Sequence, residues 1–142
     1  MKHFTFLLSF LGLALLTISC GDGEAETRSD CVEHVVSDCN EDASGVNVRI
    51  RNATGLDMCN LELNWGQYNL GELFDGEETC YYSQDVAYRY PSAYQFYVDD
   101  VLWGAEAIDF TGEAPLDPGY YTYEIFVIDE ADRSTSINFF ED

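Results

Sequence analysis

Apolar and polar residues alternate along most of the chain after Gly45, and the alternation has the period of two that belongs to β-strands. A strand with this pattern turns one side to the core and the other to water. The clearest runs are residues 46–51, 59–65, 93–98, 120–128 and 135–140, and shorter extended pieces are expected at 68–73, 79–82, 101–103 and 105–110. No window after the first twenty residues has convincing helical periodicity.

Turn-forming residues separate these runs. Asp75-Gly76 is a tight-turn dipeptide, and Asp99-Asp100 separates two extended pieces. Asp117-Pro118-Gly119 predicts a further turn, because proline presets φ and glycine accepts a positive φ. Pro91 interrupts the extended piece at residues 87–90, so an edge strand or a bulge is expected there.

Seven to nine short strands with such spacing predict an all-β fold, an antiparallel β-sandwich of immunoglobulin-like size over residues 45–142. A small β-barrel is the alternative. Residues 20–44 are rich in acids, glycine and serine and contain one apolar cluster, so they predict a flexible tether without a core of its own.

The first nineteen residues have the pattern of an export signal. Lys2 and His3 precede an apolar run at residues 4–18, which is shorter than the roughly 20 apolar residues that span a bilayer. The run ends in Leu16-Thr17-Ile18-Ser19-Cys20, which resembles the lipobox of a bacterial lipoprotein, although Thr17 and Ile18 depart from the commonest residues. Ordinary signal cleavage, with Cys20 left as a thiol, is the alternative.

The lipobox resemblance implies that Cys20 becomes the first mature residue and carries three acyl chains. Two chains already suffice for stable anchoring, so such a protein stays on its membrane. The expected location is the outer membrane, with the surface or periplasmic side left open.

A second resemblance rests on the runs VRIRNATGLDMCNLELN, YNLGELFDGEET, AYRY and AIDFTGEAPLDPGYYTYEI. Over residues 46–128 they resemble a family of small Bacteroidota lipoproteins that have one β-sandwich domain and no assigned activity. The shared motifs are turn and core positions, so the resemblance implies the fold and transfers no catalytic residue. The chain departs from that family at Cys59 and Cys80, where polar residues are usual, and a disulfide peculiar to this chain would explain both changes.

Charge restricts the partners of the domain. Without residues 1–19 the chain has five Arg and no Lys against 27 Asp and Glu, a net charge of −22. Such a field repels phosphate backbones and anionic lipid head groups, which argues against nucleic acid and against membrane contact other than through the lipid. It also favours a soluble monomer, and adaptation to a salty habitat explains the charge equally well.

Four cysteines remain when Cys20 is set aside. Cys31, Cys39, Cys59 and Cys80 are an even number in an exported chain, which predicts two disulfides and leaves three pairings open. The preferred pairing joins Cys31 to Cys39 as a local clip and Cys59 to Cys80. Zinc is disfavoured, because the spacings are not of the C-x₂-C type and His34 is the only histidine after the signal.

The residues after Gly45 include neither His nor Lys, which excludes nucleophile pairs and metal sites built on histidine as well as lysine Schiff bases. Carboxylates remain, and a carboxylate-based glycan hydrolase is one alternative function. Acidic turns offer a second alternative, a calcium-stiffened structural domain. No turn matches a calcium-loop motif, and solvated hairpin tips explain the same acids at 75–78, 99–100 and 129–132. We predict no metal and no cofactor.

Tyrosine is the remaining candidate for recognition. Nine of the ten tyrosines are crowded into two stretches, at residues 81–97 and 120–123. Because strands alternate faces, some of them are expected on an outer surface. The predicted binding face consists of Tyr82, Tyr88, Tyr90, Tyr94 and Tyr97. Arg89 is expected to pair with an acid or to stack on a ring. The sequence thus predicts a noncatalytic, lipid-anchored module that presents a β-sandwich to an envelope protein or a glycan.

Overall fold

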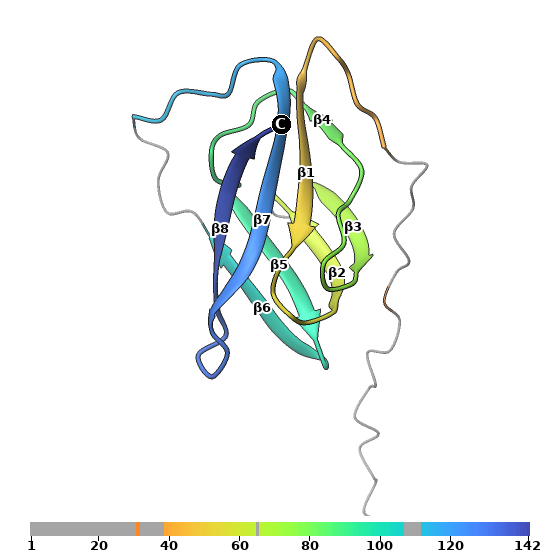
Figure 1. Ribbon diagram of the computed structural model, residues 1–142, viewed down its shortest axis with the longest axis vertical. Helices are drawn as coiled ribbons and strands as arrows, with labels where there is room; N and C mark the ends of the chain where they lie inside the picture. Colours follow the sequence, from red (N-terminus) through yellow and green to blue (C-terminus); the bar gives the residue numbers. More distant parts are fainter. Residues whose placement is uncertain (1–30, 32–38, 65, 107–111) are drawn as a thin grey trace, which may run out of the picture.

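The computed structural model describes residues 31, 39–64, 66–106 and 112–142, and all of its regular elements are strands. In chain order they are β1 (Val46–Asn52), β2 (Met58–Leu63), β3 (Tyr68–Leu73), β4 (Tyr82–Gln84), β5 (Ala93–Val98), β6 (Val101–Glu106), β7 (Gly119–Asp129) and β8 (Ser134–Glu141). They form two packed four-stranded sheets (Figure 1). The predicted β-sandwich is confirmed.

The first sheet has the strand order β4-β1-β7-β8, and the second has the order β3-β2-β5-β6. Every neighbouring pair is antiparallel except β1 and β7, which run parallel from Val46 opposite Gly119 to Asn52 opposite Ile125. This parallel pair joins segments about half the chain apart. It places the first strand of the domain in the middle of its sheet.

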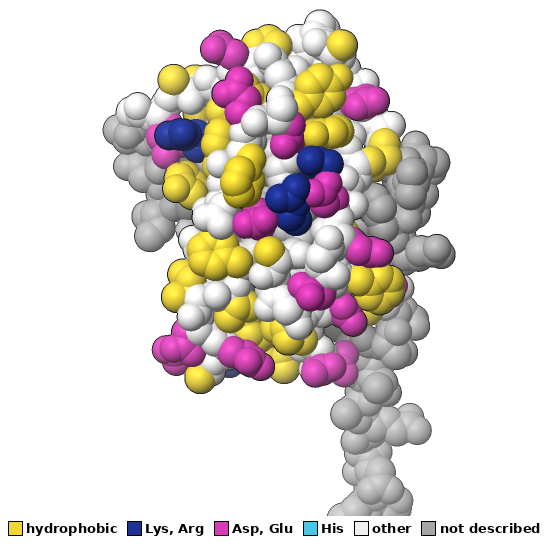
Figure 2. All heavy atoms as spheres, viewed as in Figure 1, with side chains coloured by type: hydrophobic (Ala, Val, Ile, Leu, Met, Phe, Trp, Pro, Cys, Tyr) yellow, Lys and Arg dark blue, Asp and Glu magenta, His cyan; other side chains and the backbone are white. Residues whose placement is uncertain are grey.

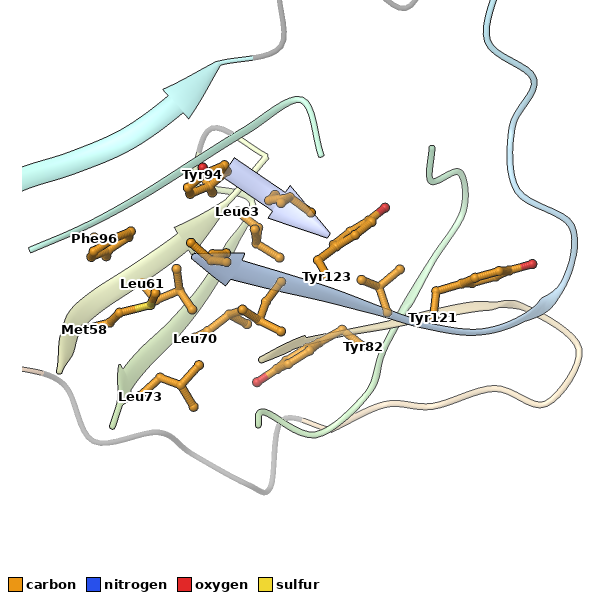
Figure 3. Packing of buried hydrophobic residues seen from close by; sticks show 14 of the residues in the cluster. Met58, Leu61, Leu63, Leu70, Leu73, Tyr82, Tyr94, Phe96, Tyr121 and Tyr123 are labelled. Carbon is orange, nitrogen blue, oxygen red and sulfur yellow. The ribbon is translucent and has the colours of Figure 1, made fainter. Parts of the chain in front are cut away.

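The core lies between the two sheets and follows the alternation in the sequence. Inward side chains of both sheets are almost fully buried, among them Ile50, Leu61, Phe96, Tyr123 and Ile125. Figure 3 shows leucines from β2 and β3 meeting tyrosines from β7 and from β4. One polar residue in this region, Asn52, is also fully buried, and its amide donates to the carbonyls of Leu56 and Leu73 at 2.8 and 2.9 Å. The burial of that amide is therefore compensated by hydrogen bonds.

Some predicted elements are placed differently. The short strand expected at residues 79–82 begins later, as β4, while Thr79 pairs with Ile50 through its amide and its hydroxyl at 2.8 and 3.0 Å. The piece at residues 87–90 is a connection, with no strand assigned. Ala105 and Glu106 belong to β6, and residues 107–110 lie outside the described residues, as does Trp65. The turn at Asp99-Asp100 is confirmed, with positive φ angles of 48° and 61°.

The two ends of the sandwich carry different loops. One end has the connections 85–92 and 112–118 and is called the loop end; the amide of Leu116 donates to the carbonyl of Ala87 there, at 2.9 Å. The other end has the connections 53–57, 74–78, 99–100 and 130–133 and is called the hairpin end. In Figure 1 the loop end is at the top and the hairpin end at the bottom.

All four predicted cysteines form disulfides, but the preferred pairing is wrong. Cys31 is bonded to Cys59 and Cys39 to Cys80, with Cα–Cα distances of 5.1 and 5.7 Å. Loop-closure entropy favours a short clip between neighbours in sequence, whereas here the fold brings Cys59 and Cys80 to separate places on the sandwich. Each of them binds one cysteine of the predicted tether.

Candidate functional site

The five tyrosines of the predicted binding face do not share a surface. Tyr82 and Tyr94 are 7% and 5% exposed and belong to the core, so their assignment to a binding face is wrong. Tyr88 and Tyr97 are half-buried, the first in the loop end and the second near the hairpin end. Tyr90 is 49% exposed. Tyr90 is therefore the one tyrosine of this group whose side chain is largely open to solvent.

Strand alternation accounts for the buried tyrosines. Tyr94 and Phe96 have the same parity in β5, and both point into the core opposite Ala105 and Trp103 of β6. The hydroxyl of Tyr94 forms a hydrogen bond with that of Thr135 at 2.7 Å, which satisfies its polar end inside the sandwich. Desolvation by burial raises the pKa of Tyr94.

Tyr90 lies at the loop end, where two core tyrosines of β7 hold the loops. The hydroxyl of Tyr123 donates to the carbonyl of Tyr88, and that of Tyr121 donates to the carbonyl of Asp117 at 2.8 Å. In Figure 3 both hydroxyls point away from the labelled leucines. Each bond ties a different loop to the same strand, so the two loops are held in a fixed relation to each other.

Burial and charge keep Tyr123 protonated. Desolvation raises its pKa strongly, and the carboxylate of Glu113 raises it further. The neutral phenol is the form that donates a hydrogen bond to a carbonyl. The connection between the core and the 85–92 loop is therefore present at ordinary pH.

Between these loops lies an open hollow of about 590 Å³. Arg89 and Tyr90 come from one loop, residues 113–118 from the other, and Phe139 and Glu141 from β8. The guanidinium of Arg89 lies over the ring of Phe139, with its central carbon 5.5 Å from the ring centre, which confirms the expected stacking. We call this group of residues the loop-end hollow.

Arg89 has no ion pair in the part of the chain that the structure describes. A guanidinium carries five N–H donors, and stacking on a ring leaves the rim where they lie accessible. Glu113, Asp117 and Glu141 are exposed and line the same hollow with acceptor oxygens. The hollow therefore combines donors, acceptors and an exposed ring.

The outer face of the β4-β1-β7-β8 sheet uses similar residues differently. Arg49 and Arg51 of β1 both bind Glu78; Arg49 also approaches Asp142 at 3.6 Å, and Arg51 approaches Glu124 at 3.3 Å. Figure 2 shows Lys/Arg side chains in the middle of this face with acidic side chains against them. We call this set the arginine face.

Hydrogen bonds extend the network of the arginine face. Arg49 donates to the hydroxyl of Thr122 at 2.9 Å, and Asp142 accepts from Thr122 and Tyr81 at 2.6 and 2.9 Å. The Arg49 guanidinium also lies 5.0 Å from the Tyr81 ring centre. Hydrogen bonds to Glu78 and then Glu124 raise the pKa of Arg51. The polar groups of these side chains are therefore largely occupied by hydrogen bonds and ion pairs with one another.

Acidic side chains in the turns accept hydrogen bonds from backbone amides of the turns. Asp75 accepts from the amide of Gly55 and Asp129 from the amide of Ala131, each at 2.9 Å. Within the described ranges, no three His, Cys, Asp or Glu side chains converge on a point where a metal ion would bind.

Sequence reasoning missed the residues that share the hollow with Tyr90. Glu113, Asp117 and Glu141 stand in a turn and at a strand end, where acids are common, and only the pairing of β7 with β8 brings them to one place. Only a local feature of the sequence pointed to this site. Arg89 and Tyr90 stand directly before Pro91, which predicts an irregular segment whose side chains need not pack within a sheet.

No protein-family model, no curated protein and no solved structure matches the chain. Cys20 and the predicted signal lie outside the described residues. Among the residues that are described, no helix is long and apolar enough to cross a bilayer.

Proposed function

We propose that the protein is a noncatalytic binding module of the bacterial cell envelope. Cys20 carries the lipid anchor in the outer membrane, and a monomeric β-sandwich is presented to an envelope protein or a glycan. The observation that carries the proposal is the way the tether is attached: both disulfides join tether cysteines to the sandwich, and the one nearer to Cys20 is at the hairpin end.

The position of Cys59 defines that attachment. It is the second residue of β2 and pairs with Tyr97, next to the turn at Asp99-Asp100. Its partner Cys31 is thereby fixed beside the hairpin end. The loop-end hollow is at the other end of the sheets.

Chain lengths give the scale of the arrangement. Ten residues lie between Cys20 and Cys31, and the eleven Cα–Cα steps that join the two cysteines reach at most about 40 Å when the chain is fully extended. The eleven-residue strand β7 runs between the two ends, which corresponds to about 35 Å. An anchor at Cys20 is joined to the sandwich beside its hairpin end, so we propose that this end lies nearer to the membrane on average than the loop end.

The side chains around the hollow support a noncatalytic role. They supply a guanidinium, carboxylates and an exposed phenol, and the sequence after Gly45 lacks the His and Lys on which most general-base and nucleophilic chemistry depends. These groups suit recognition through stacking and hydrogen bonds.

Mass spectrometry of the membrane fraction tests the anchor. We expect an acylated Cys20, and we expect the Cys20→Ala variant to leave the membrane fraction. The matched control is the Cys31→Ala/Cys59→Ala double variant, which loses a disulfide and keeps Cys20; it is expected to remain membrane-bound. An unmodified Cys20 in the wild-type chain would refute the proposal.

Energy transfer to a dye in the bilayer tests the orientation. A fluorophore attached at residue 90 is expected to lie farther from the membrane than one attached at residue 100, and reduction of both disulfides is expected to diminish the difference. Equal distances in the oxidised chain would contradict the proposed presentation.

A further inference from the structure

The loop-end hollow differs from the rest of the described surface in the chemistry that it leaves available. Tyr90 is the tyrosine with the most exposed ring, at 49%. It also borders two smaller hollows, one toward Pro91 and Ile137 and one toward Asn64 and Gln84. A ring in this position can be covered by a ligand from the loop end.

The charges of the hollow select among ligand classes. A cationic ligand meets the guanidinium of Arg89, and an anionic one meets Glu113, Asp117 and Glu141 within a chain of net charge −22 after the signal. The anionic ligand is repelled more strongly, because three carboxylates face one guanidinium, and a cationic ligand still has to avoid the guanidinium next to the exposed Tyr90. An uncharged ligand with many hydroxyl groups avoids both, because each hydroxyl donates to a carboxylate and accepts from a guanidinium.

We infer that the loop-end hollow binds an uncharged saccharide, with the apolar C–H face of a sugar ring stacked on Tyr90 and its hydroxyls bonded to Arg89 and the carboxylates. The electron-rich face of an aromatic ring attracts such weakly positive C–H groups. The hollow of about 590 Å³ lies within the range of about 300 to 1,000 Å³ typical of small-molecule sites. This inference rests on the proposed function, since it names the ligand class of the presented module.

The site is also built in advance of binding. The Tyr123 and Tyr121 hydroxyls hold the two loops from below, and the Leu116 amide bonds to the Ala87 carbonyl between them. The ring of Phe139 supports Arg89 from one side. Little conformational entropy remains to be lost when a ligand enters, which favours affinity for a small polar molecule.

Calorimetry with the oxidised full chain in detergent micelles tests the inference. The probes are tetrasaccharides of glucose, mannose, xylose and N-acetylglucosamine, with a tetrasaccharide of galacturonic acid as the anionic comparison. We expect binding of at least one neutral probe and weaker binding of the acidic one. Tyr90→Ala is expected to reduce the affinity by about tenfold or more, the loss of one stacking contact.

Arg89→Gln is expected to reduce the affinity for the same saccharide by about tenfold, because charge-assisted hydrogen bonds are lost. Matched controls come from the hairpin end: Phe74→Ala removes an exposed ring, 46% accessible, and Arg133→Gln removes an exposed guanidinium. Both are expected to leave the affinity unchanged. If the controls reduce it as much as the hollow variants do, the saccharide does not bind in the hollow and the inference is wrong.

Failure of the inference is separable from failure of the proposed function. If no neutral saccharide binds, the hollow is not a saccharide site, whereas the proposed function still depends on acylation of Cys20. If a probe binds and is cleaved, the noncatalytic part of the proposed function is wrong and the saccharide assignment of the hollow stands. Tighter binding of the galacturonic acid probe would contradict the selection against anions.

Discussion

The arginine face and the loop-end hollow contain the same kinds of side chains and use them in opposite ways. On the arginine face, Arg49 and Arg51 are paired with Glu78, Glu124 and Asp142 and covered by rings. In the hollow, Arg89 stacks on a ring and has no described carboxylate partner. Residue type alone therefore does not show whether an arginine is held by internal ion pairs, because that depends on the acidic neighbours that the fold places beside it.

The difference follows from the backbone. Arg49 and Arg51 alternate with core residues in a central strand, so their side chains lie on the outer face of the sheet. There they meet Glu124 of β7, Glu78 in the connection before β4 and Asp142 just after β8. Arg89 lies in a connection that leaves one sheet for the other. A loop offers fewer regular neighbours, and its polar groups remain available to a ligand.

Alkaline pH is expected to cause the largest loss of stability, and to affect the loop end more than the arginine face. The pKa values of Tyr123 and Tyr94 are raised in the folded chain, chiefly by burial. The folded state therefore resists their ionisation, and stability is retained below the unfolded tyrosine pKa of about 10 and lost as pH rises through the folded values. One pH unit above the unfolded pKa, each buried tyrosine lowers the free energy of unfolding by up to about 1.4 kcal/mol.

Urea denaturation at a series of pH values measures this loss. Amide exchange should show the 85–92 and 112–118 loops opening before β1, because these loops are held by the hydroxyls of Tyr123 and of Tyr121, whose pKa is also raised by burial. The arginines of the sheet stay charged over the same pH range. Opening of both regions together would show that the loops have no separate attachment.

Replacing one arginine of each region by glutamine is expected to give the next largest effect, a difference between the two variants in the free energy of unfolding. Arg49→Gln removes one ion-pair partner from Glu78 and one from Asp142, and it removes the guanidinium that donates to the Thr122 hydroxyl, all on a half-buried surface. Glu78 keeps its contact with Arg51, and Asp142 still accepts from the Tyr81 hydroxyl. We expect a loss of about 2 kcal/mol in the free energy of unfolding. Arg89→Gln is expected to change it by less than about 0.5 kcal/mol, as for an ordinary surface residue. Equal losses in the two variants would remove the basis for treating the regions differently.

Removing the Tyr123 hydroxyl should have a smaller effect. Tyr123→Phe leaves the carbonyl of Tyr88 without this donor, and we expect a loss of about 1 kcal/mol in the free energy of unfolding. Tyr120→Phe serves as the control, because Tyr120 packs edge-on against Tyr81 on the outer face. Saccharide affinity should fall in the first variant and not in the second. An unchanged affinity in Tyr123→Phe would mean that Tyr90 is positioned without this bond.

The strands were predictable where alternation decides the structure. β1, β5, β7 and β8 appear near the predicted residues because each has an apolar side that must face a core. β4 was misplaced because it has three residues at a sheet edge, where burial dictates little. The parallel pairing of β1 with β7 depends on contacts between distant residues, which no local pattern records.

The disulfides and the site were predictable only in part. The number of cysteines indicated two bonds, but their partners depend on where β2 and the segment before β4 lie in space. Alternation alone would have placed Tyr94 with Phe96 and away from Tyr97, and so would have reduced the predicted tyrosine face. The partners of Tyr90 in the hollow required the tertiary structure.

Salt should have the smallest effect on the stability differences between the wild type and the two arginine variants. High salt screens the repulsion within a chain of net charge −22 after the signal, so the wild-type protein and both arginine variants should gain stability. Salt also weakens the attraction within the arginine face, so the difference between the wild type and Arg49→Gln should shrink, by no more than about 0.5 kcal/mol. The difference between the wild type and Arg89→Gln should not decrease in the same way, because Arg89 has no described ion pair for salt to weaken. Urea denaturation at low and high sodium chloride measures both differences, and equal shrinkage in the two variants would mean that Arg89 takes part in an ion pair in solution.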